Sequence, residues 1–257
     1  MLAWLWRGIR GGRITTRYPQ APEPPPAGFH SLVEVLRGDG GESDMERLCP
    51  TGAITVDDAT HVRLDRGRCI LCGECVRRAG EHFAFTDHSF ETAARSRAGL
   101  LSDDSEAISA IRPTLAERGP ALRRSIHVRH IDCGSDGSEE WEIQALWNPY
   151  YDIQRLGFFL TPAPRHADIL LVTGGVTTPM RAALERTWEV MPEPKALIAV
   201  GTDACSGGLA AGGRHIAGGV DQVLPVDVYV PGSPPPPIAI MHGLLTAVGL
   251  LGEDQAA

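Results

Sequence analysis

Residues 167–190 read ADILLVTGGVTTPMRAALERTWEV, and this stretch decides the fold of the larger part of the chain. An apolar run of strand length ends in two glycines and leads into the helical segment PMRAALERTWEV. KALIAVGTD, at 195–203, again places a short apolar strand before a turn. Because apolar strands that alternate with helices form a parallel sheet covered on both faces, the sequence predicts an α/β domain.

Two more strands flank this stretch in the sequence. RRSIHVRHID predicts the first strand, before the glycine-rich turn CGSDGSEE and the helix WEIQALW, and VLPVDVYVPG predicts the last. In open parallel sheets, ligands bind beyond the carboxyl ends of the strands. The loops that follow the four strands are therefore expected to converge at one edge, and they lie near 133–139, 174–178, 202–208 and 232–237.

Length and composition limit the classes of function. A chain of 257 residues can hold one large α/β domain and a small one. Its formal charge of −8 argues against nucleic-acid binding, because a basic stripe is needed to neutralise phosphates. Six cysteines are too few for a disulfide scaffold, and three of them fall within seven residues. Such a run is typical of metal ligation in a reducing compartment.

Proline, cysteine and charge patterns divide the chain. The proline-rich YPQAPEPPPAG cannot be a helix or a central strand. Short extended pieces around the cysteines indicate a small α+β domain that a metal stabilises. The predicted organisation is an N-terminal arm with a connector (1–28), the small domain (29–90), a helical or loose linker (91–120) and the α/β domain (121–257).

Both ends of the chain are apolar without being long enough to span a bilayer. The N-terminal MLAWLWRGIRGGR is apolar and then basic, the reverse of a secretory signal. Its leucines, tryptophans and isoleucine against Arg7, Arg10 and Arg13 suit either a helix on a membrane surface or a helix that docks on protein. IAIMHGLLTAVGLLG, at 238–252, predicts a packed C-terminal helix. Any membrane contact is therefore expected to be peripheral.

The segment RCILCGECV carries the clearest chemical signal. Cys69, Cys72 and Cys75 have the Cys-x-x-Cys-x-x-Cys spacing that supplies three ligands of a four-iron cluster. In ferredoxins with two such runs, the last cysteine of each run is followed by proline and ligates the other cluster. Cys49 is followed by Pro50, so it is expected to complete the set. The sequence predicts one [4Fe–4S] cluster.

The same logic identifies a second cluster that the chain has lost. Counting back from Cys49, the first run should have cysteines where Asp39, Glu42 and Met45 stand, and its distant ligand should be at Ala79. All four ligands of one cluster are replaced and all four of the other remain, which random loss would not be expected to produce. Two alternatives remain for the retained cysteines: buried or disulfide-bonded thiols, and a structural zinc site.

GRITTRYP, the proline-rich connector, CPTGAI and RCILCGECV together resemble the two-cluster ferredoxin-type subunits of respiratory complex I and of related membrane-bound hydrogenases. The resemblance covers roughly residues 5–100 and is specific in the cysteine region. It implies a ferredoxin-like fold and electron transfer. The chain departs from this family in keeping the ligands of a single cluster.

A second resemblance runs from about 124 to 250, through IDCGSDGSEEWEIQAL, PRHADILLVTGGVT and MPEPKALIAVGTDACSGG. This part looks like the small subunit of group 4 nickel–iron hydrogenases of the formate hydrogenlyase type. It is also similar to the complex I counterpart, the 20-kDa subunit of NADH-quinone oxidoreductase. The resemblance implies a flavodoxin-like α/β domain, preceded here by the small α+β ferredoxin-like domain. It also implies a four-iron cluster that exchanges electrons with a large partner subunit.

The ligands of that cluster are absent from this chain. Aligned on the shared motifs, the four ligand positions fall at Asp136, Glu139, Asp203 and Ser233. Cys133 and Cys205 lie close by in the sequence but are offset from these positions. The favoured interpretation is a vestigial cluster site. Two others stay open: a magnesium or calcium site made by the three carboxylates, and an unusual cluster with oxygen ligands plus Cys133 or Cys205.

Taken together, the two resemblances imply an electron-transfer subunit that fuses two chains commonly found apart. The implied partners are a large hydrogenase-like or complex I 49-kDa-like subunit and antiporter-like membrane subunits. The expected location is the cytoplasmic face of the inner membrane, reached by peripheral contact. No residue pattern indicates a general base or nucleophile. The alternative functions are a redox-silent scaffold subunit of such a complex and a free soluble ferredoxin.

Overall fold

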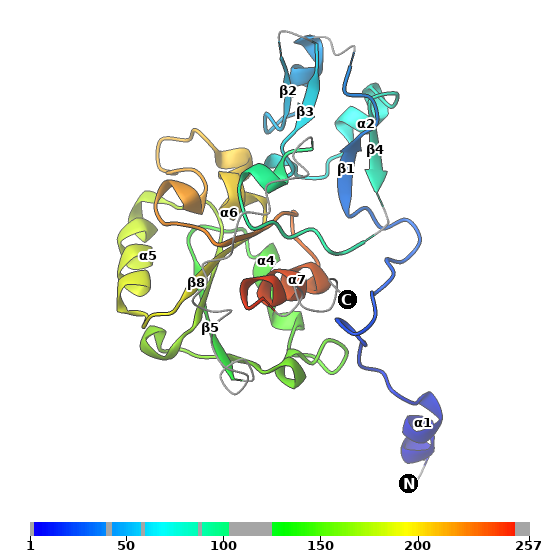
Figure 1. The fold of residues 1–257 in the computed structure, drawn as a ribbon, viewed down its shortest axis with the longest axis vertical. Coiled ribbons are helices and arrows are strands. Elements are labelled where there is room, and N and C mark those ends of the chain that lie inside the picture. Colours follow the sequence, from blue (N-terminus) through cyan, green and yellow to red (C-terminus); the bar gives the residue numbers. More distant parts are fainter. Residues whose placement is uncertain (1–2, 40–42, 58–59, 87–88, 103–124, 250–257) are drawn as a thin grey trace.

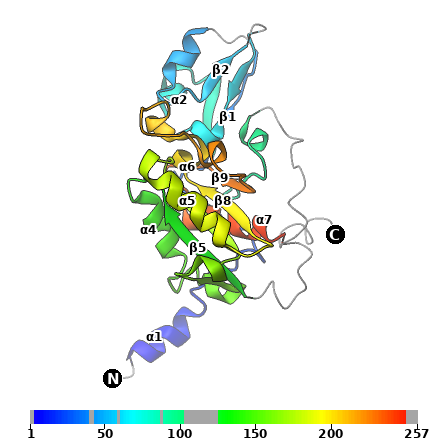
Figure 2. The ribbon, with the colours of Figure 1, turned by 90° about the vertical axis from the view of Figure 1, so that its left-hand side faces the viewer.

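The computed structural model describes residues 3–39, 43–57, 60–86, 89–102 and 125–249. A large domain occupies the middle of the molecule, with a small domain at one end and the N-terminal helix α1 (Ala3–Gly11) at the other (Figure 1). Viewed from the side of α5, the small domain stacks above the edge of the sheet that carries α6, and α1 projects from the opposite end (Figure 2).

The large domain is built on a five-stranded sheet in which all neighbours are parallel. Its spatial order is β6-β5-β7-β8-β9. The strands are β5 (Ile126–Asp132), β6 (Phe158–Leu160), β7 (Ile169–Thr173), β8 (Ala196–Val200) and β9 (Val228–Val230). The central strands β7 and β8 are buried along their whole length, as expected for a sheet covered on both faces.

Helices cover the two faces of the sheet and form a separate apolar core on each. One core joins Ile169 and Leu171 of β7 to side chains of α4 and α7, and the other joins Leu170 and Val172 to α5 and α6. Successive side chains of one strand therefore enter opposite cores, as the period of two requires. The helices are α4 (Ser138–Ala145), α5 (Thr178–Val190), α6 (Thr202–Ser206) and α7 (Pro237–Ala247).

The predicted α/β class is confirmed, and the four expected strands correspond to β5, β7, β8 and β9. The structure adds β6, which the sequence analysis did not predict. This strand is three residues long and pairs with β5 at the edge of the sheet, where Leu160 is exposed. Its segment is too short to display a period of two, so its formation depends on the adjacent β5.

The small domain contains two antiparallel pairs of short strands. β1 (Leu32–Val35) pairs with β4 (Phe83–Thr86), and β2 (Ile54–Val56) pairs with β3 (Val62–Leu64). Two 3₁₀ helices, η1 (Ser43–Leu48) and η2 (Arg66–Arg68), and the helix α2 (Glu74–Arg78) complete it. Its core is small, with Phe83 and Leu64 among the fully buried side chains. A core of this size agrees with the expectation that the domain needs further stabilisation.

The N-terminal arm connects the two ends of the molecule along the large domain. Tyr18 is buried in the core of the large domain, and its hydroxyl donates a hydrogen bond to Glu91 (3.0 Å). The amide of Thr16 donates to the carbonyl of Tyr150 (2.8 Å). The predicted C-terminal helix is confirmed over α7, which is almost entirely buried. Within the described part of the chain, no helix has the length and apolar character that crossing a bilayer requires.

Residues 91–102, the first part of the predicted linker, pack against both domains, while 103–120 lie outside the described residues. Ala94 pairs through its backbone with Tyr229, in β9, and Leu101 pairs with Asp65 beside β3. The guanidinium of Arg97 forms two hydrogen bonds with the carboxylate of Asp65, one of them 2.7 Å long. It also lies 3.8 Å from the carboxylate of Asp221 in the large domain. Arg97 therefore joins the domains electrostatically.

We expect Arg97→Ala to lower the free energy of unfolding by about 2 kcal/mol, because it removes the two hydrogen bonds of Arg97 to the carboxylate of Asp65, which is 16% exposed and keeps only the more distant Arg68 (3.5 Å) as a charged partner. The measurement is urea denaturation of the wild type and the variant. Arg181→Ala is the matched control, since its pair with Glu185 is exposed on one helix and contributes less than about 0.5 kcal/mol. Equal losses in both variants would contradict the bridging role.

Candidate functional site

The four predicted cluster cysteines gather in the small domain on three short elements. Cys49 follows η1, Cys69 follows η2, and Cys75 lies in α2, with Cys72 in the loop between them. Burial, and to a smaller extent the nearby sulfurs of the other three cysteines, together raise the pKa of the Cys69 thiol to about 12. Burial, with Cys49 and Cys72 nearby, also raises the pKa of Cys75. The four thiols are thus close enough to repel one another as thiolates.

Backbone amides point toward these sulfurs. The amide of Ala53 lies 3.2 Å from the Sγ of Cys49 and donates to it. The backbone of Leu71 donates to Cys69, and that of Val76 to Cys75. Hydrogen bonds of this kind stabilise thiolate ligands and tune the potential of a bound cluster.

The loop that carries these amides is bent by its backbone conformation. Leu71 has φ +57° and Gly73 has φ +72°, both in the left-handed region. At position 73 a Cβ would lie 2.9 Å from the ring of Phe85, so only glycine fits there. The loop between Cys69 and Cys75 is therefore folded tightly around its sulfurs.

The chemistry of this donor set fits a [4Fe–4S] cluster. Cys69 and Cys75, whose pKa values are raised, need a positive centre nearby to hold them as thiolates, and iron supplies one. Among the residues that the structure describes, no three His, Cys, Asp or Glu side chains are arranged around one point as ligands of a single metal ion. Each thiolate of a four-iron cluster binds a different iron atom, so a cluster does not require that convergence. The four-cysteine site itself stays a prediction.

The positions of the lost cluster also come together. Asp39, Met45 and Ala79 line one cavity of about 440 Å³, while Glu42 lies outside the described residues. Arg37 and His82 contribute to the same cavity, and the Nδ1 of His82 donates to the carbonyl of Arg37 (2.9 Å). Residues far apart in the sequence thus surround one space, and the former cluster itself stays a prediction.

The carboxyl edge of the large sheet brings the three predicted carboxylates together. Asp136 and Glu139 lie on either side of Ser138, whose hydroxyl is 2.6 Å from the Oδ1 of Asp136 and 3.2 Å from the Oε2 of Glu139. The charges of Asp203 and Asp136 both contribute to raising the pKa of Glu139. The loops after β5 and β8 therefore meet, as the sequence analysis expected.

Burial sets the electrostatics of this edge. Glu139 is only 2% exposed, and burial raises its pKa to about 7. Burial, followed by the charge of Asp136, also raises the pKa of Asp203. Hydrogen bonds from Ser138 lower the pKa of Asp136, which is less buried than the other two carboxylates. At position 201, whose φ is +90°, a Cβ would overlap the carboxyl of Glu139, so glycine is required for this packing.

Other residues considered for this site lie elsewhere. Ser233 is exposed and, within the described structure, forms no hydrogen bond with the three carboxylates. Arg165, an arginine that could in principle offset their charge, precedes β7 at the amino end of the strands. Cys133, and Cys205 of α6, are fully buried in the core on the α5 side of the sheet. The charged group near Cys133 is Asp132, and those near Cys205 are Arg97, Asp65 and Asp221. None of these is one of the three carboxylates, which does not support a cluster with mixed oxygen and thiol ligands.

The retained cysteine loop abuts the carboxylate edge directly. The hydroxyl of Thr202, the first residue of α6, lies 2.9 Å from the carbonyl of Cys69 and 3.1 Å from that of Gly232. The amide of Thr202 also donates to Gly232 (2.8 Å). One buried threonine thus links the loop after β8, the loop after β9 and the backbone of a predicted cluster ligand.

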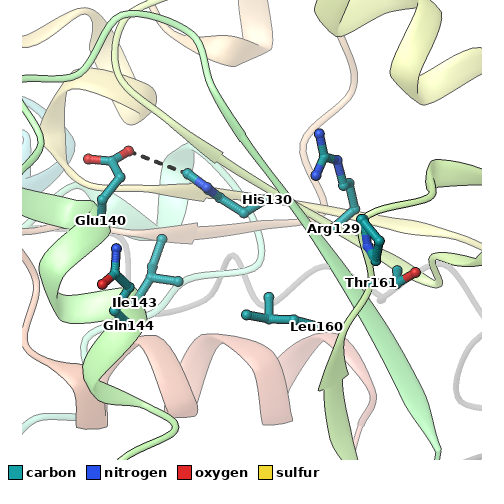
Figure 3. Close-up of a pocket in the computed structure, with 8 residues that line it drawn as sticks. Arg129, His130, Glu140, Ile143, Gln144, Leu160 and Thr161 are labelled. Atoms are coloured by element: carbon teal, nitrogen blue, oxygen red, sulfur yellow. Dashed lines mark ion pairs between the residues drawn. The ribbon is translucent and has the colours of Figure 1, made fainter.

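Sequence analysis missed a polar network between the ends of β5 and β7 and the helix α4 (Figure 3). The Nε2 of His130 lies 2.9 Å from the hydroxyl of Thr173 and 3.4 Å from the carboxylate of Glu140. The hydroxyl of Ser135 donates to that carboxylate as well (2.7 Å). His130 and Glu140 both line a pocket of about 390 Å³, and the dashed line in Figure 3 marks their ion pair. The available signal was a break in the alternation of β5, where His130 follows the buried apolar positions Ile126 and Val128 at the same spacing.

Fold and site together define an α/β subunit whose sheet edge is joined to a small cysteine-bearing domain. Residues 136–247 match the family of the NADH ubiquinone oxidoreductase 20 kDa subunit. The chain is 41% identical to the probable membrane-bound hydrogenase subunit mbhJ of Pyrococcus furiosus, over 51% of this chain and 79% of that protein. The chain therefore belongs to the family of the 20 kDa subunit.

Two further relatives extend the comparison. Formate hydrogenlyase subunit 7 of Escherichia coli is 42% identical over 148 residues, which cover 58% of this chain and 57% of that protein. A subunit of the NADH-quinone oxidoreductase of Heliobacterium modesticaldum is 45% identical over 40% of this chain and 60% of its own length. The chain thus spans little more than half of these two relatives. The family match lies wholly within the large domain.

We expect the stability of the protein to fall between pH 4.5 and pH 7 through Glu139. The folded state holds this proton up to about pH 7, whereas an unfolded glutamate releases it near pH 4.3. The native state therefore binds more protons in this window, and its stability decreases by up to about 3 kcal/mol as the pH rises. Glu139→Gln should remove this loss, measured by urea denaturation at pH 5 and pH 8. Glu189→Gln, at an exposed helix position, is the control and should keep the loss. An unchanged pH dependence in the Glu139 variant would contradict the assignment.

We also expect that the cavity of the small domain can hold a cluster again. Replacing Asp39, Glu42, Met45 and Ala79 by cysteine should raise the iron content from about four to about eight atoms per chain. Anaerobic reconstitution followed by iron and sulfide analysis measures this. The same variant with Ala79 kept lacks one ligand and serves as the control. If the four-cysteine variant gains no iron over this control, the cavity is not a former cluster site.

Proposed function

We propose that this chain is an electron-transfer subunit of a membrane-associated oxidoreductase of the complex I or formate hydrogenlyase type. It carries one [4Fe–4S] cluster on Cys49, Cys69, Cys72 and Cys75. The observation that carries the proposal is the grouping of these thiols with backbone amides directed at three of them. Membership of the 20 kDa subunit family and the names of the relatives support the type of complex.

When bound, the cluster supplies storage for a single electron. The residues of the chain bury it, donate hydrogen bonds to its ligands and hold it beside the large domain. Thr202 donates a hydrogen bond to the backbone carbonyl of Cys69. Arg97 binds Asp65, and so holds the segment that leads into Cys69. This arrangement supports an electron route from the small domain toward the carboxyl edge of the large sheet. The chain itself makes and breaks no bonds in this role.

The proposed partners follow from the relatives and from the shape of the chain. A large hydrogenase-like or complex I 49-kDa-like subunit would cover the edge of the sheet, and antiporter-like subunits would provide the membrane part. The chain is proposed to fuse a ferredoxin-type subunit with a 20-kDa-type subunit, and to lie on the cytoplasmic face of the membrane. Without a cluster at Asp136, Glu139 and Asp203, the partner has to supply the next electron carrier.

One observation favours a second function, that of a redox-silent scaffold subunit. The edge of the large sheet carries three neighbouring carboxylates in place of thiols, yet its loops remain packed through Gly201 and Thr202. A domain that keeps its fold without its cluster can still hold a partner subunit in place, and this could be its whole role. In that case the remaining cluster would stabilise the small domain and would not change its oxidation state during turnover.

The decisive experiment is iron and sulfide analysis with EPR on anaerobically purified protein. We expect about four iron atoms per chain and one signal after dithionite reduction. Cys72→Ala should lose both, because it removes one of the four ligands. Cys133→Ala is the matched control, since Cys133 is buried in the other domain and should leave the cluster intact.

Three outcomes would count against parts of this account. About eight iron atoms with two signals would mean that the carboxylate edge holds a cluster. One tightly bound zinc with no iron would replace the electron-transfer role by a structural one. A four-iron cluster that stays oxidised at every potential reached by the assembled complex would favour the scaffold function.

A further inference from the structure

The helix α1 is attached to the molecule at one end only. In both views it projects away from the large domain, at the end opposite the small domain (Figures 1 and 2). Trp6 and Ile9 are 60% and 66% exposed, and Ile14, just after the helix, is 64% exposed. A folded chain rarely leaves large apolar side chains together in solvent without a partner for them.

Positive charge accompanies this apolar surface. Residues 1–22 contain four arginines and no aspartate or glutamate, whereas the whole chain carries a net charge of −8. The guanidinium of Arg10 lies over the ring of Trp6, 5.6 Å from its centroid. The basic and apolar groups of α1 are therefore adjacent, and the rest of the molecule is strongly acidic. This charge separation would orient the molecule at an anionic surface, with α1 toward it and the acidic bulk away from it.

The base of the helix brings two further arginines together. Burial, and then the positive charge of Arg13, lowers the pKa of Arg155 in the large domain. The Nη2 of Arg155 donates to the carbonyl of Tyr18, and Asp152 lies near enough to offset part of its charge, but its buried Nε has no hydrogen-bond partner among the described residues. Two like charges are thus held close together where α1 joins the body. An anion at this point would relieve their repulsion.

We propose that α1 and the arginines at its base bind the surface of a membrane that contains anionic phospholipids. Trp6 and Ile9 enter the boundary between headgroups and acyl chains, while Arg7, Arg10 and Arg13 contact headgroup phosphates. A docking site on a partner protein would not require every charge in this segment to be positive. The proposal does not depend on the iron–sulfur cluster, so its failure would leave the electron-transfer role as it stands.

The test is co-sedimentation of the full-length protein with vesicles of phosphatidylcholine alone and of phosphatidylcholine with phosphatidylglycerol. We expect binding to the anionic vesicles, weakened by added salt, and little binding to the neutral ones. The double change Arg7→Gln with Arg10→Gln should weaken binding about 25-fold, at about fivefold per arginine. Trp6→Ser should weaken it about tenfold or more through the lost apolar contact.

The matched control is Arg186→Gln with Arg214→Gln, which alters the net charge equally at two exposed arginines of the large domain. This variant should bind as the wild type does. Loss of binding equal to that of the Arg7 and Arg10 variant would show a general charge effect and overturn the proposal. Failure of the wild type to bind anionic vesicles would also overturn it, and would leave a partner protein as the ligand of α1.

Discussion

The structure depends on one constraint, that parallel strands deliver all their following loops to a single edge of the sheet. In this chain the loops after β5, β8 and β9 meet near Thr202, whose backbone and side chain contact Gly232 and Cys69. The small domain is bound at this edge, so the predicted cluster lies where a ligand of an α/β sheet is expected. Arg97 joins the same two domains beside it. The fold and the proposed electron route thus share one contact surface.

The same edge shows what replacing thiolates by carboxylates entails. The positive iron atoms of a cluster would offset part of the charge of its thiolate ligands, whereas Asp136, Glu139 and Asp203 have to share a partly buried space with one another. The raised pKa of Glu139 means that the site reduces its negative charge by holding a proton near neutral pH. Neutralisation by a proton requires no metal and no arginine, and it accounts for a loop that stays packed against Gly201. The vestigial interpretation is therefore physically self-consistent.

Much of this could be predicted because its signals are local. Buried strands such as β7 are continuous apolar runs, and the spacing of Cys69, Cys72 and Cys75 is visible within one short stretch of sequence. The convergence of the carboxylates followed from strand direction alone. β6 and the path of residues 91–102 could not be predicted, because both are determined by distant partners, β5 and Tyr229. The His130 network forms only where β5, β7 and α4 meet, and no periodicity in the sequence indicates that meeting.

Fusion of the two domains in one chain has a mechanical consequence. The arm reaches the large domain through Tyr18 before the small domain begins, and residues 91–102 return to it afterwards. The small domain is thus tethered to the sheet on both sides of its sequence. A contact that two separate subunits would have to form at the expense of translational freedom is here intramolecular. The hydrogen bond from Thr202 to Cys69 therefore needs little strength to hold the predicted cluster at a fixed distance from the sheet edge.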